Sequence, residues 1–67
     1  MYIIQEIQTT NGASALLPAV TKADWAEAES AWHSIMASAA ISAVPVHTVI
    51  MYDEHGNILQ RGYYEHE

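Results

Sequence analysis

One segment of the chain, residues 22–42, has the apolar periodicity of a helix, and it lies between two stretches that are typical of β-strands. Thr21 is a good N-cap, and Asp24 follows it in a weak capping-box arrangement. Pro45 ends the helix, because the residue before a proline is pushed towards extended backbone. A single helix can cover only one face of a sheet. The sequence therefore predicts a sheet with one face left to water or to another molecule.

The stretch before the helix predicts a β-hairpin. Residues 2–10 alternate in the way a strand does, with apolar side chains on both faces. Asn11-Gly12 follows, and this pair is the strongest short hairpin signal because a type I′ turn needs positive φ at both central positions. The second strand runs over residues 13–17, and Pro18 ends it or places it at an edge of the sheet.

The stretch after the helix predicts a second hairpin, with strands over residues 46–52 and 58–64 and with Gly56 in the left-handed position of the turn. The predicted fold is a single α+β domain, residues 1–67, in the order ββαββ. Its four-stranded, mostly antiparallel sheet has the helix packed across one face. In the predicted register both faces of this hairpin are apolar: one carries Val49, Met51, Leu59 and Tyr63, and the other carries Ile50, Tyr52, Ile58 and Tyr64.

Size and composition favour self-association. The chain has 67 residues and no cysteine, so a marginal core cannot be reinforced by disulfides. Only 15% of its residues are charged, against about a quarter in ordinary soluble domains. We therefore expect a homo-oligomer.

The helix has two stripes that differ in chemistry. The first is apolar and is expected to pack on the sheet: Trp25, Ala28, Trp32, Ile35, Met36 and Ala39. The second is made of small side chains at four-residue spacing, which would let a second helix approach closely. A solvent-exposed polar face and a ligand-approach surface are the alternatives. The predicted interface residues are Ser30, Ser34, Ser38, Ser42, Ala37 and Ile41.

The net charge of −6 argues against nucleic acid and anionic membranes as partners, because both are bound by clustered Lys and Arg. Lys22 and Arg61 are the two basic residues of the chain. No targeting segment is visible, and we expect a cytoplasmic protein. Enzyme motifs, metal-ligand spacings and cofactor signatures do not occur, so we expect no catalysis, no metal and no cofactor.

Arg61 is the residue most suited to hold a ligand. In the predicted register it shares a face with His47 and Tyr63, and an arginine among aromatic rings can hold a phosphate or carboxylate. The alternative is that Arg61 pairs with an acid such as Glu6 or faces water. If they do not bind a ligand, His33 and His47 are expected to be hydrogen-bonded structural histidines. The candidate ligand-binding residues are His47, Arg61, Tyr63, Tyr64 and His33.

Three segments carry a resemblance to a known group: residues 27–44, Val46-His47-Thr48-Val49, and residues 53–57. Here the chain resembles small uncharacterised proteins of phages and prophages of Gram-positive bacteria. The resemblance implies a viral accessory protein in the cytoplasm of an infected or lysogenic host. Such a protein would bind a host protein or sequester a small nucleotide signal, as in counter-defence. A structural or assembly protein of the phage particle is the alternative, and a weak metal-binding protein or small hydrolase is the second alternative.

Overall fold

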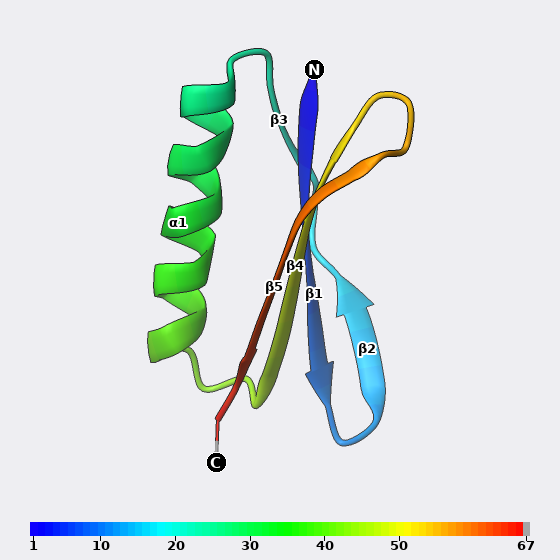
Figure 1. The fold of residues 1–67 in the computed structure, drawn as a ribbon. Helices are drawn as coiled ribbons and strands as arrows, with labels where there is room; N and C mark the ends of the chain where they lie inside the picture. Colours follow the sequence, from blue (N-terminus) through cyan, green and yellow to red (C-terminus); the bar gives the residue numbers. More distant parts are fainter. Residues whose placement is uncertain (67) are drawn as a thin grey trace.

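The computed structural model describes residues 1–66, and the last residue of the predicted domain, Glu67, lies outside the described residues. Within this range the chain forms one helix over one face of a five-stranded antiparallel sheet (Figure 1). The predicted α+β class is confirmed, with one strand more than predicted. In chain order the elements are β1 (Tyr2–Thr10), β2 (Ala13–Leu16), β3 (Val20–Lys22), α1 (Trp25–Ile41), β4 (Val46–Asp53) and β5 (Ile58–Glu65).

Strand β1 lies inside the sheet and has partners on both sides. On one side it pairs with β4, which in turn pairs with β5. On the other side it pairs with β2 and β3, which follow one another along the same edge. Asn11 and Gly12 connect β1 to β2 with φ values of 52° and 79°, the positive values that a type I′ turn requires. The predicted first hairpin is confirmed.

The segment before the helix differs from the prediction. Thr21, the predicted N-cap, lies in β3 and pairs with Ile3. Asp24 caps the helix instead, and its side chain accepts a hydrogen bond from the Ala26 N–H at 2.9 Å. Thr and Asp are both good caps, so the local sequence does not decide between them; the pairing of β3 with β1 keeps Thr21 extended. The element order is therefore βββαββ rather than ββαββ.

The core lies between α1 and the face of the sheet that it covers. Ile4, Val49 and Met51 are fully buried there, under Ala28 and Trp32 of the helix. The predicted apolar stripe of the helix is confirmed as its core side, with Ile35 and Met36 partly buried and Trp25 at its margin 46% exposed. Within residues 1–66, no helix is long and apolar enough to cross a membrane.

A β-bulge in β5 changes which of its side chains face the helix. Met51 pairs with Gln60, but its neighbour Tyr52 pairs with Ile58, so Leu59 is an extra residue in β5. Successive side chains in a strand point to opposite faces. One extra residue therefore moves every later side chain of β5 to the other face.

The predicted register of β5 is wrong as a result of this bulge. Tyr64 shares the helix-covered face with Val49, and Tyr63 lies on the opposite face. Gly62 also faces the helix, where an added Cβ would come within 2.6 Å of Trp32 Cζ2. A side chain at this position would clash with the helix, which accounts for a glycine in the middle of a strand.

Candidate binding surfaces

The face of the sheet opposite the helix is a large surface that no described element covers, and we call it the open face. Its members follow from the strand pairing, because directly paired residues point to the same side. Ile3, Ile7 and Ile50 on the two inner strands are only half-buried, by their neighbours in the sheet. The open face consists of Ser14, Leu16, Thr21, Ile3, Gln5, Ile7, Thr9, Val46, Thr48, Ile50, Tyr52, Ile58, Arg61, Tyr63 and Glu65.

Apolar side chains extend across the open face to both of its margins. Leu16 on β2 is 70% exposed, and Ile58 and Tyr63 on β5 are 61% and 60% exposed. Among the described strand residues, Arg61 and Glu65 are the only charged side chains on this face. The middle of the open face is thus uncharged, with isoleucines beside Gln5 and Thr48. One basic and one acidic residue lie along the β5 margin.

Tyr63 connects to the acidic residue of this margin. Its hydroxyl donates a hydrogen bond to the carboxylate of Glu65. This bond, followed by desolvation and by the negative charge of Glu65, raises the pKa of Tyr63 above its ordinary value of 10.0. The carboxylate of Glu65 is therefore held on the open face by its own strand.

The predicted ligand-binding residues do not converge. His47 faces the helix and is 1% exposed, whereas Arg61 pairs with Ile50 and lies on the open face. Tyr63 accompanies Arg61, and Tyr64 accompanies His47. The sheet itself separates the two pairs, because the Leu59 bulge places Arg61 on the side opposite to the predicted one.

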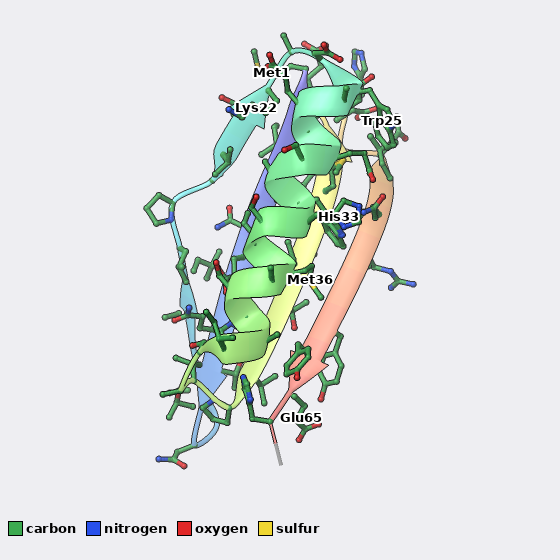
Figure 2. The ribbon with its side chains drawn as sticks, turned by 90° about the vertical axis from the view of Figure 1, so that its left-hand side faces the viewer. Met1, Lys22, Trp25, His33, Met36 and Glu65 are labelled. Carbon is green, nitrogen blue, oxygen red and sulfur yellow. The ribbon has the colours of Figure 1, made fainter. Side chains whose placement is uncertain are left out.

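His33 lies apart from both pairs, on the helix. Its side chain is exposed, by 73% (Figure 2). Its Nε2 lies 3.4 Å from Oε2 of Glu29 one turn earlier. This is an i,i+4 pair on a solvent-exposed surface, a contact that contributes little to stability. The structure therefore divides the five candidates among the helix surface, the helix-covered face and the open face.

His47 belongs instead to a buried polar cluster. Its Nδ1 lies 2.7 Å from Oε2 of Glu6, whose side chain is 13% exposed. The side chain of Gln8 donates to the same carboxylate oxygen at 3.4 Å. His47 Nε2 is buried and has no hydrogen-bond partner among the described residues. The expectation of a hydrogen-bonded structural histidine is confirmed for His47. Its partner is Glu6, the acid that was considered as a partner for Arg61.

His66, which directly follows β5, also belongs to this cluster. Its ring centroid lies 6.0 Å from that of His47 and 4.9 Å from that of Tyr64. Its Nε2 hydrogen-bonds to the carbonyl of Ala39 at 2.8 Å, in the last turn of the helix. Sequence reasoning missed this contact, because His66 follows the last predicted strand and no local pattern marks it. The cluster ties the end of β5 to the end of α1.

The small-residue stripe of the helix lies on the surface. Ser30, Ser34, Ser38 and Ala37 are exposed, and Ile41 is 89% exposed. Ser42 differs: it is the half-buried C-cap, and its Oγ accepts a hydrogen bond from the Val44 N–H at 3.1 Å. The stripe is thus accessible to a second molecule, and its use as an interface stays a prediction.

No pocket opens on the described part of the chain, and no three of its His, Asp and Glu side chains are arranged to hold a metal ion. Comparison of the chain with known protein families, curated proteins and solved structures finds no match. The surfaces described above are the features that the structure offers for function.

Proposed function

We propose that the protein is a non-enzymatic binding protein and that it binds another protein through the open face. The observation that carries this proposal is the position of Ile3, Ile7 and Ile50, which lie on the inner strands of a sheet face that no described element covers. Single exposed apolar residues are ordinary, but contiguous apolar patches of more than a few hundred Å² mark interaction sites.

The dimensions of the open face suit this role. The molecule measures 33 × 20 × 17 Å along its principal axes. Its broadest face is therefore on the order of 600 Å², close to the roughly 800 Å² that each partner contributes to a standard protein interface. Apolar surface contributes roughly 25 cal/mol per Å² when it is removed from water. The main-chain pairing already orders the backbone of these residues, so the entropy lost when they are covered would come mainly from their side chains.

The chemistry of the open face favours a protein partner over a nucleotide. The chain has a net charge of −6, and Arg61 is the one basic residue among the described members of the open face. A nucleotide site built on Arg61 would lack His47 and Tyr64, which lie on the other side of the sheet. An apolar protein surface needs neither of them. Within this proposal, the resemblance to small phage proteins suggests a host protein as the partner, with counter-defence in the host cytoplasm as the outcome.

A photo-crosslinking amino acid at Thr48 tests the proposal. Thr48 lies in the middle of the open face, paired with Ile7 on one side and Tyr63 on the other. We expect the probe to capture a specific protein in host cells, and we expect the change Ile50→Asp to abolish the capture while circular dichroism shows that the fold is kept. The matched control places the probe at Ser34 on the exposed side of α1. Equal capture from both positions, or capture that persists with Ile50→Asp, would contradict the proposal.

A further inference from the structure

The two edges of the sheet differ in their protection against pairing with another chain. One edge consists of β2 and β3, two short strands separated by a loop that contains Pro18. The other is β5, which pairs with β4 and, within residues 1–66, with no strand on its outer side. Natural proteins protect edges by shortness, lysine, proline or bulges. β5 has eight residues without lysine or proline, and its bulge lies near its start, so most of its edge is regular.

Figure 2 shows β5 in salmon at the margin of the sheet, beside the helix rather than beneath it. Large apolar side chains gather on this strand: Ile58, Leu59, Tyr63 and Tyr64 are all exposed, by 37% to 61%. They point to both faces. A strand that lies next to β5 would therefore cover apolar surface on each side of the sheet.

The hydrogen bond at the end of β5 shows which of its backbone N–H and C=O groups point away from the sheet. The N–H of His66 donates to the carbonyl of Pro45 at 2.7 Å, so the backbone of residue 66 points towards the preceding strand. In an antiparallel pair this direction alternates from one residue to the next. Arg61, Tyr63 and Glu65 therefore direct their N–H and C=O groups away from the sheet, where a further strand would bond to them.

We propose that a second copy of the chain pairs with this edge, β5 against β5 in antiparallel orientation, with the two-fold axis at Tyr63. In this register Arg61 of each copy lies directly opposite Glu65 of the other. These two residues are equally distant from Tyr63, so a two-fold axis there matches both charges at once. They are also the only charged strand residues among the described members of the open face.

The same register fits the side of the sheet that faces the helix. Gly62 would lie opposite Tyr64 of the second copy, in a pair whose side chains approach closely. Gly62 has no side chain, and Trp32 and Met36 lie directly beneath it. The ring of Tyr64 would lie over the backbone of Gly62, as aromatic residues do for glycines in paired strands.

Other registers do not place Arg61 of one copy opposite Glu65 of the other. An axis at Arg61 would place the two guanidinium groups directly opposite each other, and like charges in that position are destabilising. An axis at Gly62 would place Arg61 opposite Tyr63 and would leave Glu65 opposite Leu59, with no directly opposed ion pair. Charge complementarity therefore selects Tyr63 as the centre.

This dimer would join two five-stranded sheets into one of ten strands, with the two open faces side by side. It does not depend on whether the open face binds a host protein. The two proposals also fail separately, since one concerns the edge of the sheet and the other concerns its face.

A charge exchange tests the register. Arg61→Glu would set two carboxylates opposite each other at both symmetric positions, because the residue facing position 61 is Glu65 of the other copy. We expect the dissociation constant of the dimer to rise about tenfold or more. The double variant with Glu65→Arg restores opposite charges and should restore the dimer. Both side chains are exposed, so the fold should be unaffected.

Two outcomes of this experiment overturn the proposal. The first is a wild-type chain that stays monomeric at high micromolar concentration in analytical ultracentrifugation. The second is a double variant whose dimer is as weak as that of the single variant, because a matched register requires the exchanged charges to attract each other again.

A cysteine gives a second test that does not depend on charge. The chain has no cysteine of its own. In the proposed register the two Tyr63 residues form a directly opposed pair with Cα atoms about 5.5 Å apart, within the range that a disulfide bridges. Tyr63→Cys should therefore form a disulfide-linked dimer on mild oxidation, and Ser34→Cys should not. Failure of Tyr63→Cys to cross-link, or equal cross-linking by Ser34→Cys, overturns the proposal.

Discussion

His47 and Glu6 form a buried pair between β4 and β1, with Nδ1 of the imidazole 2.7 Å from Oε2 of the carboxylate. The two residues are 41 positions apart in the chain, and the histidine is 1% exposed. A buried polar group is costly unless it is hydrogen-bonded. Because Nε2 of His47 has no partner among the described residues, the bond to Glu6 is the contact that satisfies this side chain.

Loss of that carboxylate should therefore weaken the fold. Glu6→Ala leaves the imidazole of His47 buried without its partner, and we expect the free energy of unfolding to fall by about 1–3 kcal/mol. Urea denaturation followed by circular dichroism measures the change. Glu54→Ala is the matched control, since Glu54 is exposed and its carboxylate forms an ion pair with the exposed N-terminal amine. An equal effect of the two changes would show that the buried pair has no special importance.

A side chain at Gly62 should strain the packing of the helix on the sheet. The Cβ of Gly62→Ala would lie 2.6 Å from Trp32 Cζ2 and 2.9 Å from Met36 Sδ. Overpacking of this kind costs about 1–3 kcal/mol, which corresponds to a fall in melting temperature of at least ~4 °C for a domain of this size. Trp32→Phe in the same chain should recover part of the loss. Strictly additive effects of the two changes would argue against a clash with Trp32.

The turn between β4 and β5 predicts a measurable pH effect. The side chain of Asn57, then its backbone N–H, donates to the carboxylate of Asp53, and these bonds hold the pKa of Asp53 below its ordinary value of 3.8. A lowered pKa in the folded state means that Asp53 contributes stability above the unfolded pKa and loses it as pH falls through the folded pKa. Asn57→Ala should raise the pKa of Asp53 towards 3.8 in an NMR titration. An unchanged pKa would contradict the role of the Asn57 side chain.

The serine stripe of the helix and the β5 edge make opposite predictions about assembly. Ser38 is exposed in the middle of the stripe. If the copies associate through β5, Ser38→Lys should leave the molecular mass in light scattering unchanged, as an ordinary surface substitution does. Dissociation of the assembly by this change would favour helix–helix packing over pairing through β5.

Local signals in the sequence predicted the first hairpin and the presence of the helix. The residue at which the helix starts depended on long-range strand pairing. Asn11-Gly12 located the first hairpin because positive φ is a property of those residues themselves. The helix start was predicted at Thr21 rather than at Asp24, because the strand β3 that keeps Thr21 extended forms only when β1 is beside it.

Local sequence patterns could not predict that the candidate ligand-binding residues lie on two different faces of the sheet. The face of Arg61 depended on the bulge at Leu59, which is set by pairing with β4. Gly62 was the available signal for that face, because a glycine within a strand indicates a close approach by another element.

The position of β1 between its partners has a consequence for how the chain is made. Its hairpin with β2 can form once residues 2–16 have left the ribosome, but its other side stays unpaired until Val46–Asp53 has followed. At ribosomal rates of about 5–20 residues per second, that interval is on the order of a few seconds. During this time the nascent chain exposes a strand edge and the isoleucines of β1. Chaperone capture and mispairing between neighbouring nascent chains are the hazards of that interval.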